Sequence, residues 1–320
     1  MSSREAIERF DCFGGSCAVI VAGEGPPAAS VAAARAREQL LAWHDAFSRF
    51  RADSELSRLN ADPHGQVPVS PLMAYLVAAA RWAGELTGGL VHATMAGEIE
   101  RAGYADGLPP PLPLELALAL APAREPATPS PARRWRSLRA DATRGIVERP
   151  PGLRLDSGGL AKGLFADLIA ETLSGHESFA VDCGGDLALG GSGGRPRAIR
   201  VQSPFDGSVL HTFELARTGV ATSGIGRRAW LDPAGRPAHH LLDPGSGRPA
   251  YTGVVQATAL APSALLAEIH AKAAVLAGPA GGVSWLRWGG VLVLDDGSRR
   301  VIEPPSLAGA ARRTAEPAAA

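Results

Sequence analysis

Apolar and polar positions in the first third of the chain change between a short continuous apolar run and longer stretches with helical spacing. The run at 16–23, SCAVIVAG, predicts a buried strand. A helix is expected over 28–48, closed by the polar stretch 51–60. The apolar positions of 72–86 again repeat at helical spacing, and Ser70, which precedes a proline, is a suitable N-cap. This part of the chain therefore predicts one strand followed by two helices.

Strand-like and helical segments interleave through the rest of the sequence. The patterns predict strand-like sequence at 145–156, a helix from Ser157 to Gly175, a strand at 178–182, short strands within 197–222, a strand at 253–260, a helix capped by Ser263 and stopped by Gly278–Pro279, and a last strand at 291–296. Because the segments follow no regular βαβ rhythm, we expect an α+β fold, a mixed α/β sandwich.

We expect one domain over residues 1–303. Its least regular part is 109–131, where eight prolines surround the segment LELALALA, which predicts a loop or insertion with one short helix. Residues 304–320 are of low complexity and are expected to form a disordered tail.

Charge and hydropathy exclude several classes of protein. Thirty-two basic and thirty-two acidic side chains give zero formal charge, so we expect no recruitment of nucleic acid or of an anionic membrane. The longest apolar runs are shorter than the ~20 residues that cross a bilayer, so no membrane insertion is expected. The first ten residues are charged where a signal peptide would be apolar. Three cysteines, an odd number without metal-ligand spacing, favour a reducing compartment, and we expect a cytoplasmic protein.

Three residues are rare in this arginine-rich chain. Among its 32 basic residues only Lys162 and Lys272 are lysines, and Asn60 is its single asparagine. Residue types that persist against such a bias are candidates for chemistry, although chance alone would also leave a few.

The segment LDSGGLAKGLFAD at 155–167 is a candidate anion site. Gly158 and Gly159 allow close backbone approach just before a predicted helix, whose first amides and the ammonium of Lys162 suit a phosphate. The spacing is not that of a P-loop. The alternative is a tight turn followed by a surface lysine.

Three further segments each permit a functional and a structural interpretation. Gly184-Gly185-Asp186 could admit a ligand against the backbone or form a two-residue hairpin turn. His240, three residues before Asp243, could accept a proton near neutral pH or be structural. Glu268 and Lys272, four residues apart on a predicted helix, form an ordinary intrahelical ion pair in the simplest interpretation.

Taken together, these segments resemble the ApbE family of FAD:protein FMN transferases over about residues 12–297. The similarity depends on the order of the motifs DSELSRLN (53–60), TGGLVHAT (87–94), LDSGGLAKG (155–163), DCGGDLALGG (182–191), VATSG (220–224), HHLLDPGSGRP (239–249) and AEIHAKAAVLAG (267–278).

The resemblance implies an enzyme that cleaves the pyrophosphate of FAD, attaches FMN through a phosphoester to a Thr or Ser of an acceptor flavoprotein, and releases AMP. It implies that His240, Lys162 and Asp243 serve catalysis. It also implies the following cofactor-binding residues: Ser54, Glu55, Asn60, Thr94, Gly158, Gly159, Lys162, Gly184, Gly185, Asp186, Thr222 and Ser223. The oligomeric state is left open.

The resemblance further implies a Mg²⁺ ion held by the backbone carbonyl of Ala161 and by an Asp and a Thr of the last motif. Here those two residues are Glu268 and Lys272, and a protonated lysine cannot ligate a hard cation. In addition, His92 replaces the aspartate of the second motif, and Phe13 replaces an early methionine. We therefore hypothesise that the Lys272 ammonium, paired with Glu268, takes the place of the metal. The alternatives to a transferase are an FAD pyrophosphatase and a non-catalytic FAD-binding protein.

Overall fold

The central element is an eight-stranded sheet in which every neighbouring pair of strands is antiparallel. This computed structural model describes residues 5–105, 107 and 109–305. The strands, in their spatial order, are β1 (Ala6–Cys12), β2 (Gly15–Ala22), β6 (Ser178–Cys183), β7 (Asp186–Gly190), β10 (Thr218–Gly224), β15 (Val254–Ala261), β16 (Gly290–Leu294) and β17 (Arg299–Ile302). Without parallel crossovers, the sheet belongs to the α+β class, as the sequence predicted.

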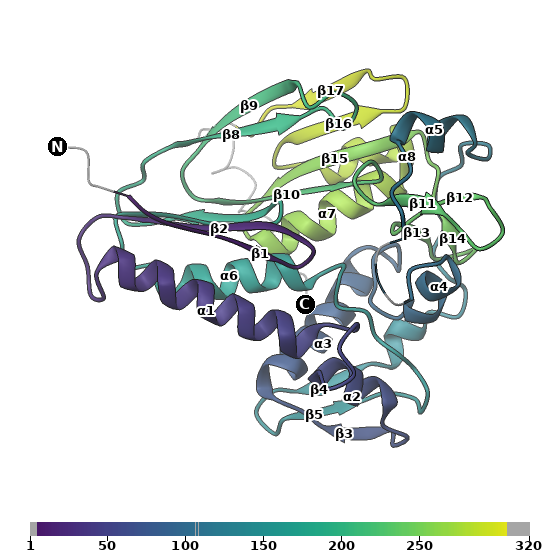
Figure 1. The fold of residues 1–320 in the computed structure, drawn as a ribbon, viewed down its shortest axis with the longest axis horizontal. Coiled ribbons are helices and arrows are strands. Elements are labelled where there is room, and N and C mark those ends of the chain that lie inside the picture. The colour runs from purple at the N-terminus through teal and green to yellow at the C-terminus, as the bar shows by residue number, and fades with distance from the viewer. Residues whose placement is uncertain (1–4, 106, 108, 306–320) are drawn as a thin grey trace, which may run out of the picture.

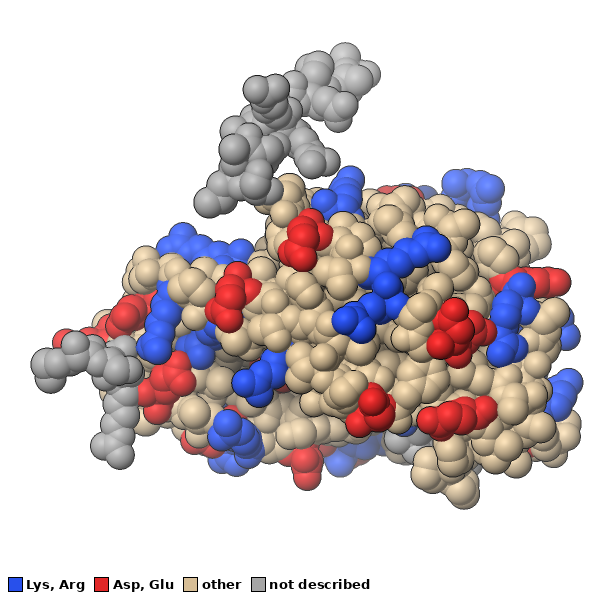
Figure 2. Space-filling view, turned by 90° about the horizontal axis from the view of Figure 1, so that it is seen from above, with Lys and Arg blue, Asp and Glu red and all other residues tan. Residues whose placement is uncertain are grey.

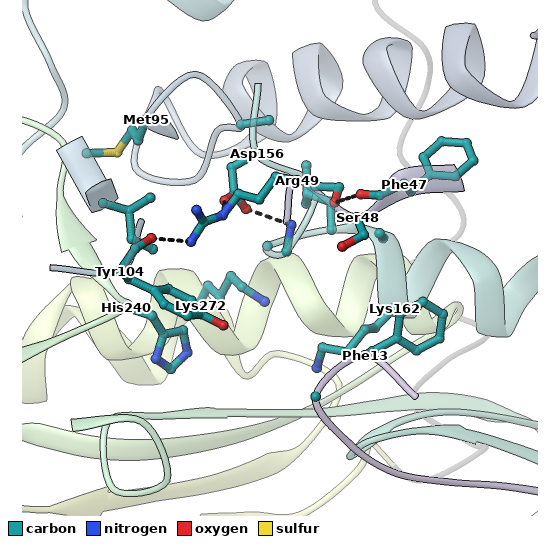
Figure 3. A pocket seen from close by; sticks show the side chains of 18 of the residues that line it. Phe13, Phe47, Ser48, Arg49, Met95, Tyr104, Asp156, Lys162, His240 and Lys272 are labelled. Atoms are coloured by element: carbon teal, nitrogen blue, oxygen red, sulfur yellow. Dashed lines mark hydrogen bonds and ion pairs between the residues drawn. The ribbon is translucent and has the colours of Figure 1, made fainter. Parts of the chain in front are cut away.

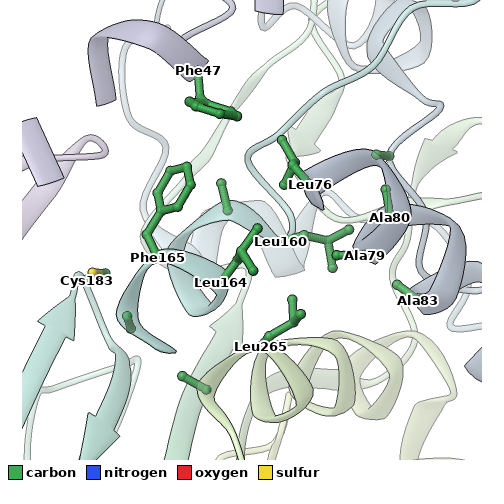
Figure 4. Packing of buried hydrophobic residues seen from close by; sticks show 14 of the residues in the cluster. Phe47, Leu76, Ala79, Ala80, Ala83, Leu160, Leu164, Phe165, Cys183 and Leu265 are labelled. Carbon is green, nitrogen blue, oxygen red and sulfur yellow. The ribbon is translucent and has the colours of Figure 1, made fainter. Parts of the chain in front are cut away.

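Helices cover one face of this sheet. Figure 1 shows α1 (Ala29–Phe47), α6 (Ala161–Leu173) and α7 (Ala264–Leu276) below it, and the ribbon of β8 (Arg197–Gln202) and β9 (Val209–Leu215) above it. Figure 4 shows the packing of α1, α6 and α7 at close range: Phe165 of α6 lies beside Phe47 of α1, and Leu265 of α7 belongs to the same core cluster. These three side chains are buried.

Helices α6 and α7 are held together by a close backbone contact and by hydrogen bonds, in addition to side-chain packing. A Cβ atom on Gly163 would lie 2.7 Å from the carbonyl oxygen of Ala264, so only glycine allows this approach. Asp167 on α6 accepts the amides of Ala264 (2.7 Å) and Leu265 (2.9 Å), which satisfies the first turn of α7. The two helices therefore form one rigid unit beneath the sheet.

The remaining elements extend the molecule beyond the sheet. They are α2 (Glu55–Ala61), α3 (Pro71–Leu86), α4 (Ala96–Arg101), α5 (Leu114–Ala119), η1 (Arg134–Ser137), α8 (Gly278–Gly281), η2 (Gly282–Trp285), the small sheet of β3 (Gln66–Pro68), β5 (Ile146–Glu148) and β4 (Arg139–Asp141), and the pairs β11 (Ala229–Leu231) with β12 (Pro237–His239) and β13 (Leu242–Asp243) with β14 (Arg248–Pro249). None of the helices in the described ranges combines the length and apolar character that a membrane span needs.

Most elements match the sequence predictions. The N-caps Ser70 and Ser263 accept the amides of Met73 and Leu266 at the starts of α3 and α7. The Pro-rich segment 109–131 holds the single short helix α5. That residues 1–303 form one domain stays a prediction, and the tail residues 306–320 lie outside the described residues.

Three expectations about the elements were wrong, and one helix was not predicted. The polar stretch 51–60 contains helix α2, which Ser54 caps through its hydroxyl. Residues 153–156 form no strand, and α6 begins at Ala161 because residues 157–160 form a turn. The strand at 291–296 is not the last, since β17 follows it.

Candidate functional site

One cavity of about 540 Å³ joins the glycine-rich turn to the candidate base. Gly158, Gly159, Lys162, His240 and Lys272 all line it. In Figure 3 the side chains of both lysines and of His240 converge on the same region, which Arg49 and Asp156 border from the opposite side. The fold therefore brings Lys162 and His240, which are 78 positions apart in the sequence, to the same cavity.

Each lysine of the cavity has a buried carboxylate partner. Lys162 donates to Oδ2 of Asp186, and Nζ of Lys272 lies 2.9 Å from Oε1 of Glu268. Both carboxylates have no exposed surface. Burial raises the pKa of Asp186 to about 6 even though Lys162 opposes the shift. Burial also acts to raise the pKa of Glu268, but the charges of Lys272 and Lys162 outweigh it and the pKa falls below its usual value.

The turn that carries the glycines is fixed from two sides. The Asn60 amide group accepts from the Leu155 amide (2.7 Å) and donates to its carbonyl (2.8 Å), which clamps the start of the turn. Asp156 forms a 2.7 Å ion pair with Arg49. Asn60 thus acts through the backbone at Leu155 and does not line the cavity.

Several amides that the sequence assigned to an anion are already bonded within the protein. Those of Gly158, Leu160 and Ala161 donate to Asp156 or to the Ser157 carbonyl. The amide of Gly163 donates to Oε2 of Glu268 (2.8 Å). An anion in this cavity would therefore meet side-chain cations more than helix amides.

His240 is held as a neutral imidazole. Burial, followed by the charges of Arg228, His239, Lys272 and Lys162, lowers its pKa well below the usual value. Its Nδ1 atom is buried and makes no hydrogen bond within the described residues. A neutral imidazole that lines a cavity can accept a proton.

The residues at the expected magnesium position do not fit this ion. Mg²⁺ requires a near-octahedral set of oxygen ligands. Both oxygens of Glu268 accept hydrogen bonds from the protein, and the third candidate, Lys272, brings an ammonium group. No group of three His, Cys, Asp or Glu side chains in the described part of the chain could hold a metal. The Glu268–Lys272 ion pair therefore stands at the two positions where the resemblance expects an aspartate and a threonine as metal ligands.

Other predicted site residues have contacts that support the fold around the cavity. Glu55 accepts the amide (2.6 Å) and hydroxyl (2.8 Å) of Ser70, which ties α2 to α3. Asp243 accepts the amides of Thr128 (2.7 Å), Gly245 (3.0 Å) and Ser246 (3.1 Å). The predicted site residues that lie outside the cavity lining are Ser54, Glu55, Asn60, Thr94, Gly184, Gly185, Asp186, Thr222, Ser223, Asp243 and Glu268.

The Gly184–Gly185 pair forms the two-residue turn between β6 and β7. Their φ angles are +70° and +98°, as in a type I′ hairpin, and Asp182 accepts the Gly185 amide (2.7 Å). The turn delivers Asp186 to Lys162, which is its contribution to the site.

Sequence reasoning missed five charged residues of the cavity: Asp45, Arg49, Arg51, Asp156 and Arg228. The two lysines stood out because lysine is rare in this chain, whereas no single arginine stands out among thirty. Asp156 stands in a motif that the sequence singled out, where it was taken only as the end of a strand.

Comparisons with known proteins identify the family to which this chain is similar. A sequence profile of the ApbE family matches residues 13–293. The chain is 26% identical over 246 residues to the FAD:protein FMN transferase of Salmonella typhimurium, across 69% of this chain and 64% of that protein. It is 34% identical over 133 residues to the transferase of Rhodobacter capsulatus, but this match spans only 25% of that protein.

Solved structures show the same fold. The ApbE protein of Thermotoga maritima superposes with a TM-score of 0.74 at 25% identity, covering 94% of this chain and 97% of that one. The apo form of the flavinyl transferase ApbE of Pseudomonas stutzeri gives a TM-score of 0.74 at 24% identity, with 94% and 95% covered.

Proposed function

This chain belongs to the ApbE family, and from that membership we propose that it is an FAD:protein FMN transferase. It would attach FMN through a phosphoester to a Thr or Ser hydroxyl of an acceptor flavoprotein and release AMP. The observation that carries the proposal is the single cavity in which Lys162, Lys272 and the neutral His240 meet. The matched regions span 25% and 64% of the two curated relatives described above, so activity, substrate and partner are all part of the proposal.

The proposed reaction moves one phosphoryl group. The acceptor hydroxyl oxygen attacks the phosphorus on the FMN side of the diphosphate, and the bond from that phosphorus to the bridging oxygen breaks. The oxygen leaves with AMP, and His240 takes the hydroxyl proton. Phosphoryl transfer depends mainly on positioning and on stabilising charge. His240 suits its role because its lowered pKa keeps the imidazole unprotonated at neutral pH.

The positive charge would come from the protein. Lys162 remains charged because Asp186 and Glu268 outweigh the effect of burial and raise the pKa of Lys162. We propose that Lys272, whose ammonium lines the cavity beside its Glu268 partner, supplies the charge that relatives would draw from Mg²⁺. The cytoplasmic location stays a prediction.

The experiment incubates the purified chain with FAD and follows AMP release by chromatography. A candidate acceptor is then added, and covalent flavin is sought by fluorescence in a denaturing gel. AMP release together with a fluorescent acceptor band supports the transferase. AMP and free FMN without that band would identify an FAD pyrophosphatase, and FAD binding without AMP would identify a non-catalytic binder.

A further inference from the structure

Arg228 projects into the same cavity from the connection between β10 and β11. Its side chain is half-buried. One guanidinium nitrogen, Nη2, donates to the carbonyls of Phe13 (3.1 Å) and Gly14 (3.4 Å), at the turn between β1 and β2. A Cβ atom on Gly14 would lie 3.0 Å from this nitrogen, so the turn and the guanidinium are in direct contact. The contact orients Arg228 without neutralising it, because carbonyls carry no net charge.

One cation that lines the cavity has no carboxylate partner. Lys162 is paired with Asp186, and Lys272 with Glu268. The other arginines that line the cavity also have carboxylate partners: Arg49 has Asp156, and Arg51 has Asp45 and Asp53. Within residues 5–105, 107 and 109–305, Arg228 has no carboxylate within 4.0 Å. Arg228 is therefore the one lysine or arginine of the described cavity lining whose charge no adjacent carboxylate offsets.

We propose that Arg228 binds the diphosphate bridge of the flavin dinucleotide and gives the cavity its preference for an anion. The inference rests on the proposed function for the identity of the dinucleotide. A guanidinium has five N–H donors, and the contacts with Phe13 and Gly14 use those of Nη2. The donors on Nε and Nη1 make no hydrogen bond within the described residues and can reach phosphate oxygens, for which arginine is well suited.

Electrostatics within the cavity agree with this assignment. Arg228 is the largest charge contribution that lowers the pKa of His240, ahead of those of Lys272 and Lys162. The Arg228 guanidinium and the His240 imidazole therefore face the same cavity, and the charge of the first affects the protonation of the second. An anion bound by Arg228 would lie within the electrostatic reach of the proposed base.

The test compares R228Q with R228K and with R227Q. Arg227 is the adjacent exposed arginine, so R227Q removes the same charge outside the cavity. Calorimetry at one fixed pH measures the affinity for FAD, for inorganic pyrophosphate and for riboflavin, which has no phosphate. We expect R228Q to weaken FAD and pyrophosphate binding about 10- to 100-fold, the usual effect of losing a charged hydrogen bond. Riboflavin affinity should stay unchanged, R228K should recover part of the loss, and R227Q should bind like wild type.

Two outcomes would overturn the assignment. Unchanged pyrophosphate affinity in R228Q would show that Arg228 does not bind the anion. An equal loss of riboflavin and pyrophosphate affinity would show that Arg228 only holds the Phe13–Gly14 turn in place. Both readouts are independent of AMP release, so a chain that binds FAD without transferring FMN would defeat the proposed function and leave this test intact.

Discussion

Nζ of Lys272 lies 2.9 Å from Oε1 of Glu268, one turn earlier on α7, and both side chains are buried. The pair stands at the two positions where the family resemblance places an acidic and a hydroxyl metal ligand. A buried pair of this kind is costly to break, because the remaining charge is left without a partner.

Wild-type AMP release should be insensitive to chelators, whereas K272T should depend on Mg²⁺. Without Lys272, the carboxylate of Glu268 loses its nearest cation, and a divalent ion can take that place. We expect K272T to lose about 3 kcal/mol of unfolding free energy without metal and to recover part of it when Mg²⁺ is added. Thermal unfolding and AMP release, each with EDTA or Mg²⁺, measure this. Abolition of wild-type turnover by EDTA, with recovery in Mg²⁺, would refute the role of Lys272.

The variant H240A should bind FAD like wild type but release AMP at least about 100-fold more slowly, in the range that general-base catalysis supplies. Since the pKa of His240 lies well below 6.5, wild-type activity should persist at pH 6 instead of halving near 6.5. Fluorescence titration and initial rates across pH test both statements. His64, whose side chain is exposed, provides the control variant H64A. Turnover at the wild-type rate in H240A would exclude the imidazole from the reaction.

FAD affinity should rise as pH falls through about 6. The pKa of Asp186 is raised by burial to about 6, so below that pH its carboxyl becomes neutral and the charge of Lys162 is no longer offset. The diphosphate bridge of FAD stays ionised, so the added attraction should be on the order of tenfold. In D186N the affinity should vary little between pH 5 and pH 7 and match the acidic limit of wild type. A wild-type affinity that falls on acidification would contradict this charge assignment.

Replacing Gly163 by alanine should destabilise the protein by about 1–3 kcal/mol, the usual cost of overpacking, despite the better helix propensity of alanine. The added methyl group would meet the backbone of Ala264 at 2.7 Å and 2.8 Å, which cannot move without separating α6 from α7. Urea unfolding measures the loss. Gly175 is the matched control, because a Cβ atom there meets nothing within 4 Å. Equal stabilities of G163A and G175A would show that α6 and α7 can move apart at Gly163 at no measurable cost in stability.

Local signals in the sequence predicted most elements of the sheet and of its helical face. Ser70 and Ser263 marked helix starts correctly because a hydroxyl that caps a helix does so within three residues. The start of α6 was predicted too early because the Ser157 hydroxyl, an apparent N-cap, donates instead to the carbonyl of Phe47, 110 positions away.

The candidate site was predictable where rarity or motif order applied, as for Lys162, Lys272 and His240. The long-range partners were not. Neither the Arg49–Asp156 pair nor the contact of Arg228 with the Phe13–Gly14 turn leaves a pattern at any fixed spacing. Asn60 was found, but the contact it makes with Leu155 depends on the folded geometry of the turn.

The antiparallel register of β2 and β6 sets Cys17 opposite Cys183, and both thiols, with that of Cys12, are free and buried. A thiol reagent can reach these sulfurs only when β2 separates from β6, the strand that leads through the Gly184–Gly185 turn to Asp186. Labelling rates in native buffer would therefore report how often the sheet opens beside the cavity, with the natural cysteines as the probe. A dinucleotide that stabilises this region when bound should slow the labelling.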